Sequence, residues 1–308
     1  MANKKIKNTT NKSTKNSFKI ILIILIGIMV TLIVFIGSFN SLEFMNPEEP
    51  LTVTQIIEDN FINHTIRMEN DSMFEIYFTP RDTSRLQQNL PVPVDGMKIE
   101  FKQEYSELFQ LLKPNPKTVV VYPIFTSGTY QEPGFYTYFR GDCDETCITN
   151  VSFNNPVIEY TSSGMTTQIL YLLGYEFVTE IDIDKNPKIL DNYETVILLH
   201  NEYVTKKIFD AISNHPNLIF LFPNALYAEI NVDYKDNTMT LIRGHNYPEQ
   251  SIANGFDYEV EERFHDYEYD TECLTWEFLE FENGHHLNCY PDGMIHTDLN
   301  ILLKMKEL

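Results

Sequence analysis

Basic side chains are scarce beyond the first nineteen residues of this chain. The 308 residues include 23 Lys and Arg against 44 Asp and Glu, which gives a formal net charge of −21. Residues 1–19 hold six of the lysines and no acid, so the remaining 17 basic and 44 acidic side chains sum to −27. Nucleic-acid binding needs a basic footprint, so this deficit argues against a nucleic-acid partner. The acidic balance is compatible with cationic ligands, but we favour a soluble domain that faces salty water.

Cysteines are also few, and none of them lies in a paired Cys-x2-Cys motif. The four are Cys143, Cys147, Cys273 and Cys289. Structural zinc sites usually combine closely spaced pairs, so this spacing disfavours zinc. An even number of cysteines in an exported domain is typical of disulfides. Among three connectivities we predict the two local ones, Cys143–Cys147 and Cys273–Cys289.

Charge is absent from the stretch Ile20–Phe39. At a rise of about 1.5 Å per residue, its length matches a bilayer core of roughly 30 Å. The basic flank precedes it, so the positive-inside rule places residues 1–19 in the cytoplasm and residues 40–308 outside the plasma membrane. The alternative is a cleaved signal peptide, which normally has a shorter apolar region and a small-x-small cleavage site. We favour an uncleaved single-pass anchor, which makes the membrane the predicted partner and leaves a protein or small-molecule partner open.

Composition divides the chain into six predicted regions. They are a cytoplasmic basic tail at 1–19, a transmembrane helix at 20–39, a proline-containing stalk at 40–50, a membrane-proximal module at 51–116, an α/β domain at 117–250 and an extension of that domain at 251–308. The alternative for residues 51–116 is an elaboration of the α/β domain. In this region we expect a helix over residues 53–61, a strand at Phe74–Phe78 and a second helix at Ile99–Leu112.

Continuous apolar runs alternate with helical patterns in the main domain. The runs predict buried strands at Thr118–Ile124, Tyr175–Ile181, Thr195–Leu199 and Leu218–Phe222. Helical periodicity predicts one helix that ends at Gly174 and another that Thr205 caps and Pro216 stops. This order indicates an α/β fold with a mostly parallel sheet and flanking helices.

The pattern changes after Glu229. Alternating apolar and polar residues predict hairpins from Ile230–Tyr234 with Thr238–Arg243, and from Trp276–Phe281 with His286–Tyr290. A terminal helix is predicted at Leu299–Met305. A two-residue turn at Asn283-Gly284 would place Cys289 opposite Phe278. The second disulfide therefore requires that the chain before Trp276 folds back or that the hairpin has another register.

A long polar and aromatic segment, Phe125–Asn150, follows the first predicted strand of the main domain. It contains Tyr130, Tyr136 and Tyr138 as well as the first predicted disulfide. Loops longer than about 12–15 residues are usually functional or disordered. The local disulfide argues against disorder, so we predict a functional loop.

Polar side chains crowd the carboxyl ends of the last two predicted strands. The first group is His200, Asn201, Glu202 and Tyr203, and the second is Asn224 and Tyr227. Ligands of open α/β sheets bind at this edge. His200 and Glu202 can converge on a metal or a substrate, or Glu202 can cap the following helix while His200 bonds the loop. His245 follows the first hairpin and either approaches the same face or is an ordinary loop residue.

The stretch VILLHNEYVTKKIFDAISNHPNLIFLFPNALYAEI, residues 196–230, carries a family pattern. It contains an apolar strand, His-x-Glu-Tyr, a helix with Asp-Ala and a later His, a second apolar strand, and Asn-x-x-Tyr. The preceding GYEFVTEIDID adds Gly-Tyr-x-x-x-Thr-x-x-Asp. Over roughly residues 117–250 the chain resembles the C-terminal domain of the N,N-dimethylformamidase large (beta) subunit and its relatives.

The resemblance implies a class I glutamine amidotransferase-like (flavodoxin-like) α/β fold. It also implies hydrolysis of a small amide at a mononuclear iron that Tyr and Glu side chains hold. By the motif, Glu202 and its neighbour His200 are the candidate catalytic residues, and Glu202 is also a candidate metal ligand. The other candidate iron ligands are Tyr130, Tyr136 and Tyr138 in the equivalent upstream loop.

The chain departs from the family at three positions. The usual glycines before His200 and Asn224 are Leu199 and Pro223, and the usual Trp after Glu-Tyr is Val204. These changes reshape the pocket and favour binding or scaffolding without turnover. The alternative function is iron-dependent hydrolysis of small amides outside the membrane.

A thiol amidotransferase is a separate expectation for this fold. That chemistry needs a Cys nucleophile on a sharp turn and a His that activates it. The corresponding turn, Pro223-Asn224-Ala225, contains neither Cys nor Ser. We therefore predict no thiol amidotransferase activity.

Overall fold

A computed structural model of the chain describes residues 52, 54–55, 66–68, 72–80, 94–154, 163–257, 273 and 275–308. Two compact units make up the chain, Met1–Glu49 and Pro50–Leu308, and every described residue belongs to the second. The predicted tail, transmembrane helix and stalk thus lie outside the described residues. Within the described ranges, no helix is long and apolar enough to cross a bilayer.

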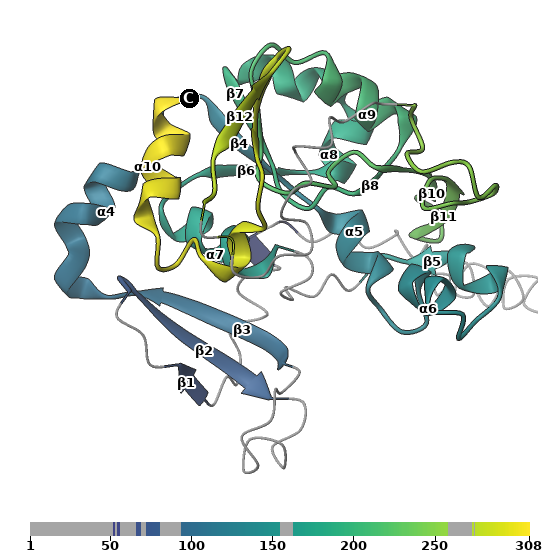
Figure 1. The fold of residues 1–308 in the computed structure, drawn as a ribbon, viewed down its shortest axis with the longest axis horizontal. Coiled ribbons are helices and arrows are strands. Elements are labelled where there is room, and N and C mark those ends of the chain that lie inside the picture. Colours follow the sequence, from purple (N-terminus) through teal and green to yellow (C-terminus); the bar gives the residue numbers. More distant parts are fainter. Residues whose placement is uncertain are drawn as a thin grey trace, which may run out of the picture. The chain divides into compact units, whose positions relative to one another are not determined.

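The centre of the second unit is a sheet with the strand order β12-β13-β9-β7-β4-β6. Its strands are β4 (Thr118–Tyr122), β6 (Glu176–Thr179), β7 (Thr195–Leu198), β9 (Leu218–Phe220), β12 (Phe278–Phe281) and β13 (Gly284–Leu287). Neighbouring strands from β13 to β6 run parallel, and β12 pairs antiparallel to β13 at the edge. Figure 1 shows this sheet among its helices. The predicted mixed α/β fold with parallel strands is confirmed.

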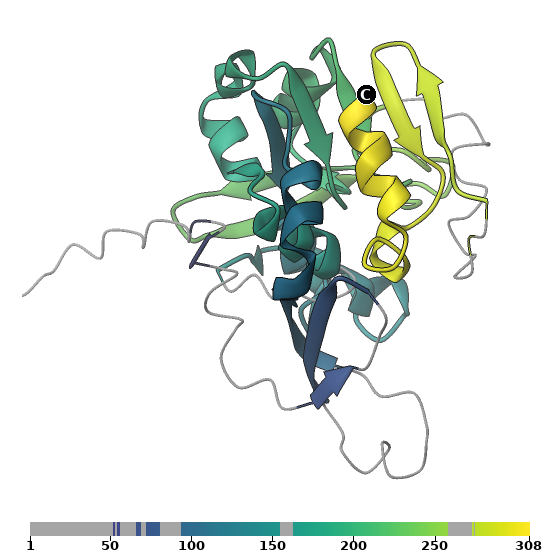
Figure 2. The same ribbon diagram turned by 90° about the vertical axis from the view of Figure 1, so that its left-hand side faces the viewer.

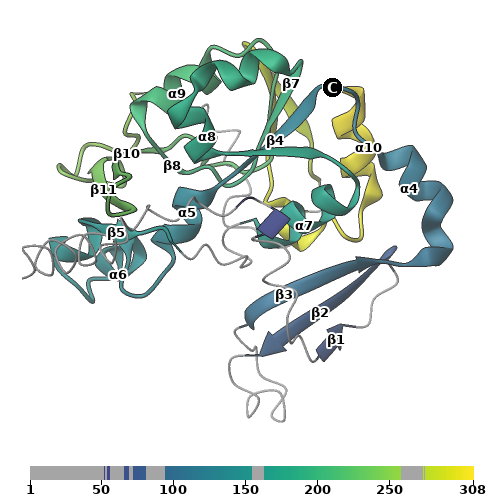
Figure 3. The ribbon, with the colours of Figure 1, turned by 180° about the vertical axis from the view of Figure 1, so that it is seen from behind.

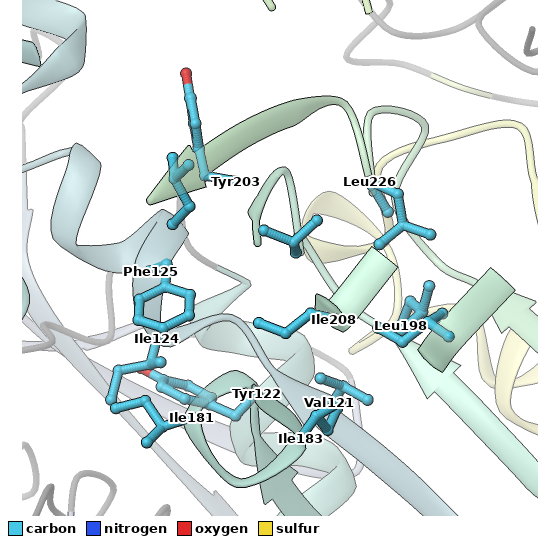
Figure 4. Close-up of a cluster of buried hydrophobic side chains, with 14 of the residues drawn as sticks. Val121, Tyr122, Ile124, Phe125, Ile181, Ile183, Leu198, Tyr203, Ile208 and Leu226 are labelled. Carbon is cyan, nitrogen blue, oxygen red and sulfur yellow. The ribbon is translucent and has the colours of Figure 1, made fainter. Parts of the chain in front are cut away.

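Helices cover both faces of the sheet because successive strand residues point to opposite sides. Val119, Val121 and Leu198 pack with α8 (Glu180–Lys185) and α9 (Lys206–Ser213). Figure 4 shows the side chains of this face. On the other face, Val120 and Ile197 pack with α7 (Gly164–Leu172) and α10 (Leu299–Glu307).

The predicted helix boundaries agree with local capping. The Thr205 hydroxyl accepts a hydrogen bond from the amide of Ile208 and so begins α9. Gly174 follows α7 with a φ of +86°, the left-handed conformation that glycine tolerates at a helix end. At the C-terminus, the Lys306 ammonium donates a hydrogen bond of 2.6 Å to the carbonyl of Leu111 in α4 (Ser106–Leu112). Figure 2 shows the yellow α10 beside the blue α4.

A second sheet has the order β5-β11-β10-β8. Its strands are β5 (Val151–Ser152), β8 (Tyr203–Val204), β10 (Ala228–Asp233) and β11 (Thr238–Arg243). The antiparallel pair β10–β11 is the first predicted hairpin. β8 pairs parallel with β10, Tyr203 opposite Ala228, so the chain just after Glu202 is fixed beside the chain just after Tyr227.

An antiparallel sheet is formed by β1 (Ile66–Met68), β2 (Phe74–Pro80) and β3 (Val94–Phe101). It is joined to α7 by Gln168, whose amide accepts from the Ile99 nitrogen at 2.9 Å and donates to the Met97 carbonyl at 2.8 Å. The predicted strand at Phe74–Phe78 is confirmed. The predicted helix at Ile99–Leu112 is wrong at its start, because buried Met97 and Ile99 alternate with polar residues in strand β3. The predicted helix over residues 53–61 lies largely outside the described residues.

The segment Phe125–Asn150 is not one long loop. It contains α5 (Ile124–Thr129), α6 (Phe135–Phe139) and a 3-10 turn at Glu145–Ile148. Every residue of α5 is buried, and helical turns satisfy the backbone polar groups that a buried loop would leave without partners. Figure 3 shows α5 and α6 next to the strands of the second sheet. A similar correction applies to the predicted strand Tyr175–Ile181, because a capping box of Thr179 and Asp182 begins α8 at Glu180.

Both predicted disulfides are present, with Cα–Cα distances of 6.1 Å for Cys143–Cys147 and 6.2 Å for Cys273–Cys289. The hairpin between the two cysteines of the second disulfide has a register other than the one expected from the Asn283-Gly284 dipeptide. Continued along the strands, this register places Cys289 opposite Trp276, so the register alone does not bring Cys289 to Cys273. Phe281 pairs with Gly284, which moves the turn to Glu282-Asn283. Gly284 begins β13 beside β9, where the two backbones approach closely. Only glycine fits there, because a Cβ would lie 2.1 Å from the Leu218 carbonyl oxygen.

Candidate functional site

The candidate site lies in the loop between β7 and β8, at the carboxyl end of the parallel strands. Asn201 closes a tight turn. Its side-chain oxygen accepts a hydrogen bond from the backbone N–H of Leu199 at 2.9 Å, and its backbone N–H donates to the Leu199 carbonyl at 2.8 Å. Such local bonds are typical of Asn in turns. The amide of Glu202 donates 3.0 Å to the Thr126 hydroxyl of α5. The loop is therefore held between its own turn and α5.

Three side chains converge on the Glu202 carboxylate. Nε2 of His245 lies 2.7 Å from Oε1, the Tyr136 hydroxyl donates to Oε2 at 2.8 Å, and Nε2 of His200 lies 3.3 Å from the same Oε2. Tyr130 extends the group, because its hydroxyl donates to that of Tyr136 at 3.0 Å and the two rings stack 4.2 Å apart. The Glu202 side chain is 1% exposed. These five side chains are called the Glu202 cluster below.

The partners of Glu202 keep it ionised despite its burial. Burial raises the pKa of this carboxyl, but the hydrogen bonds and charges of His200 and His245 outweigh burial and hold the pKa well below its usual range. Burial and the charge of Glu202 raise the phenol pKa values of Tyr130 and Tyr136. At neutral pH, in this arrangement, the carboxylate is charged and the phenols are neutral donors.

The structure brings together four of the predicted site residues, namely Glu202, His200, Tyr130 and Tyr136. Tyr138 lies elsewhere on α6. Two helical residues in succession after Tyr136 turn the side chain by about 200°, and the Tyr138 ring packs against Phe139 and Tyr247. The helix-capping alternative for Glu202 is wrong, because Thr205 caps α9.

His245 is the fifth member, and the sequence alone left its place open. It has a φ of +52° in the turn after β11, next to Gly244 and Asn246, which also have positive φ values. The rings of Phe139, Tyr203 and Tyr227 surround its imidazole at centroid distances of 5.1, 5.4 and 4.7 Å. The Gly-His-Asn order was the only local sign of this turn.

Sequence reasoning missed the ring contacts of Tyr290. This residue follows β13 in the C-terminal extension, and its ring lies 6.1 Å from that of His200 and 5.6 Å from that of Phe222. Phe222 also stacks on His200 at 5.3 Å. The extension therefore contributes to the wall of the site, which no local pattern near Tyr290 indicates.

The turn after β9 contains neither Cys nor Ser. Residues 223–226 lead into strand β10 and not into a helix, so no strand-to-helix turn presents a nucleophile there. All four cysteines are in disulfides.

The groups that could bind a cation at this site are the oxygens of one carboxylate and two phenols. In the part of the chain that the structure describes, no group of three or more His, Cys, Asp or Glu side chains is arranged to hold a metal ion. The oxygens of Glu202, Tyr136 and Tyr130 form a continuous row with spacings of 2.8 and 3.0 Å. No protein-family model matches this chain, and no curated protein matches it either.

Proposed function

We propose that the Glu202 cluster is the active site of an iron-dependent hydrolase of small amides. The proposal places it in an extracytoplasmic domain that the segment Ile20–Phe39 anchors to the plasma membrane. It also assigns the domain to the class I glutamine amidotransferase-like fold, by resemblance to the N,N-dimethylformamidase large subunit. The observation that carries the proposal is the row of carboxylate and phenol oxygens at the carboxyl edge of the parallel sheet.

The donor set fits a hard cation. Metal–oxygen bonds of about 2.0–2.1 Å at right angles put neighbouring ligand oxygens roughly 2.8–3.0 Å apart. The row formed by Glu202, Tyr136 and Tyr130 has these spacings. Carboxylate and phenolate oxygens suit ferric iron. These three residues would hold the iron, which supplies a Lewis acid for an amide carbonyl when it is bound.

The other members of the cluster orient the carboxylate. His245 and His200 contact different oxygens of Glu202, so the carboxylate plane is fixed from two sides. Groups that hold a ligand in this way tune its orientation and basicity. The His245 side chain is 24% exposed against 5% for His200 and 1% for Glu202. A small molecule would therefore approach the cluster from the His245 side.

The second candidate function is ligand binding without turnover. It is favoured by a specific observation, namely that three side chains of the protein itself contact the Glu202 carboxylate. Leu199 and Val204, where the family usually has Gly and Trp, are both fully buried and part of the core. If its contacts with protein side chains leave the Glu202 carboxylate no room for a metal, the site would bind a small polar ligand but would have no Lewis acid to activate an amide.

Amide hydrolysis by the purified full-length protein separates these two functions. The protein is supplied with ferric iron and incubated with a panel of small amides, and the released amine or ammonia is measured. Hydrolysis that Glu202→Ala abolishes supports the hydrolase. Amides that raise the unfolding temperature without any amine release support binding alone, since a ligand of the folded state stabilises it by mass action.

A further inference from the structure

Glu180 is a second buried carboxyl group close to the site, and the proposed chemistry does not use it. It is the first residue of α8 and has no exposed surface. Its Oε1 accepts from the side-chain nitrogen of Asn201 at 2.7 Å, and its Oε2 accepts from the backbone nitrogen of Phe125 at 2.8 Å. Each carboxyl oxygen therefore accepts one hydrogen bond from an N–H group.

The two donors belong to the two segments that supply the Glu202 cluster. Phe125 lies in α5, which leads directly to Tyr130. Asn201 lies between His200 and Glu202 and cannot turn its amide around, because its oxygen already accepts from the Leu199 nitrogen. Glu180 thus bridges the segment that carries the phenols and the loop that carries the carboxylate.

The hydrogen bond from the Glu202 backbone amide depends on the same distance between α5 and the loop after β7. The Thr126 hydroxyl, one residue after Phe125, accepts from the Glu202 amide at 3.0 Å and from the Tyr203 amide at 3.3 Å. A displacement of α5 relative to the loop would break these bonds and move Tyr136 away from Oε2 of Glu202.

Stability alone does not account for a carboxyl group at this position. Phe125 and Ile181 are among the buried apolar side chains that Figure 4 shows on this face of the sheet. A buried carboxyl loses its hydration there, which costs stability even when both oxygens accept hydrogen bonds. On the other face of the sheet a neutral amide, that of Gln168, joins α7 to β3 by accepting one bond and donating another.

We propose that Glu180 is a positioning residue that sets the distance between the phenols of Tyr130 and Tyr136 and the carboxylate of Glu202. The part of this inference that concerns iron affinity rests on the proposed function. The part that concerns the geometry of the cluster does not.

The substitution Glu180→Gln keeps the size of the side chain and breaks half of the bridge. A carboxamide has one accepting oxygen and one NH2 group, and both partners of Glu180 are N–H donors. Either Phe125 or Asn201 therefore loses its acceptor. Glu180→Asp is the second variant, because it keeps both oxygens but is one methylene too short to reach both donors. The matched control is Gln168→Leu, which removes two hydrogen bonds of similar length on the opposite face of the sheet.

The measurement uses full-length protein with isotope-labelled histidine. The imidazole NMR signals of His200 and His245 report the geometry around Glu202 without iron, and ferric iron titration reports affinity. We expect Glu180→Gln and Glu180→Asp to shift both signals and to lower iron affinity by about 10–100-fold, the usual effect of losing an outer-shell partner. Gln168→Leu should lower the unfolding temperature and leave both readouts unchanged.

Folded Glu180 variants with wild-type imidazole signals would overturn the inference, as would equal signal shifts in Gln168→Leu. If the wild-type protein binds no iron while the Glu180 variants still shift the signals, the proposed function fails and the positioning role stands. If the wild-type protein binds iron and the Glu180 variants bind it equally well, the positioning role fails and the proposed function stands.

Discussion

Two buried glutamates, one in the loop after β7 and one in the first turn of α8, differ in charge state although they are equally inaccessible. Glu202 contacts two imidazoles and a phenol. Burial alone would raise its pKa, but the two imidazoles hold the pKa well below the usual range. Glu180 contacts an amide and a backbone N–H, and burial raises its pKa to about 8. Burial is the same in both regions, so the partners decide the charge.

This difference separates a site from its support. The loop region gathers four ionisable side chains around one carboxylate, far more than a structural contact needs. The α8 region matches each carboxyl oxygen with one neutral donor and joins two segments of the chain. The first arrangement is typical of functional sites, where ionisable groups with perturbed pKa values cluster. The second is typical of a positioning contact.

The largest expected effect is on the pH dependence of stability at Glu180. Its pKa is raised from 4.5 to about 8 in the folded protein. Between these values the folded state holds a proton that the unfolded chain has released, so the contribution of Glu180 to stability falls as pH rises. At about 1.4 kcal/mol per pKa unit the change amounts to about 5 kcal/mol.

Glu180→Gln removes this titration. The free energy of unfolding of the variant, relative to wild type, should rise by up to about 5 kcal/mol between about pH 4 and about pH 9. Urea unfolding at several pH values measures it. A difference that stays constant with pH would show that the two glutamates do not differ as described.

The next effect concerns the opposite pH dependence of Glu202. Because its pKa is lowered, Glu202 contributes stability above the unfolded pKa of about 4.3, and that contribution is lost as pH falls below it. His245→Ala removes the closest partner of the carboxylate. We expect a cost of about 1.5–3 kcal/mol at pH 7, the usual range for a hydrogen bond to a charged group, and a smaller cost as pH falls below about 4.

The control for His245 is His215→Ala. His215 is also buried, but its ring nitrogens lie near the backbone oxygens of Asn217 and Tyr193. Both variants remove one histidine, so the titration of that histidine in the unfolded chain cancels between them. If the stability costs of His245→Ala and His215→Ala shrink equally at low pH, the Glu202 carboxylate is not stabilised by His245.

A smaller effect distinguishes the tyrosines of α6. Tyr136→Phe removes the hydroxyl that contacts Glu202, whereas Tyr138→Phe removes one from the side of α6 that packs on Tyr247. Ferric iron titration should show a loss of affinity of at least about tenfold for Tyr136→Phe and none for Tyr138→Phe. The opposite order would exchange the roles of the two residues.

Local signals were enough to predict much of this fold. The apolar runs Thr118–Ile124 and Leu218–Phe222 predict buried strands, which the structure has at Thr118–Tyr122 and Leu218–Phe220. The Thr205 cap predicts where α9 begins. The polar residues around Glu202 could be placed at the ligand-binding edge because parallel strands end together there. Cysteine spacing was enough to predict both disulfides.

The remaining features depend on contacts between distant parts of the chain. The register of β12 with β13 follows from the close approach of Gly284 to Leu218, sixty-six positions earlier. α5 is helical because it is buried against β8 and α8, although its sequence is poor in strong helix formers. His245 and Tyr290 reach the site only through the turns that follow β11 and β13. No pattern within a short window contains this information.

The iron content of the purified full-length protein tests the central claim most directly. Wild type, Glu202→Ala and the control Gln168→Leu are supplied with ferric iron, freed of unbound metal and analysed for metal, with the fold of each checked by circular dichroism. The account predicts about one iron per chain in wild type and in Gln168→Leu, and almost none in Glu202→Ala, because the carboxylate is the charged ligand of the set. Equal iron contents in wild type and Glu202→Ala would contradict it.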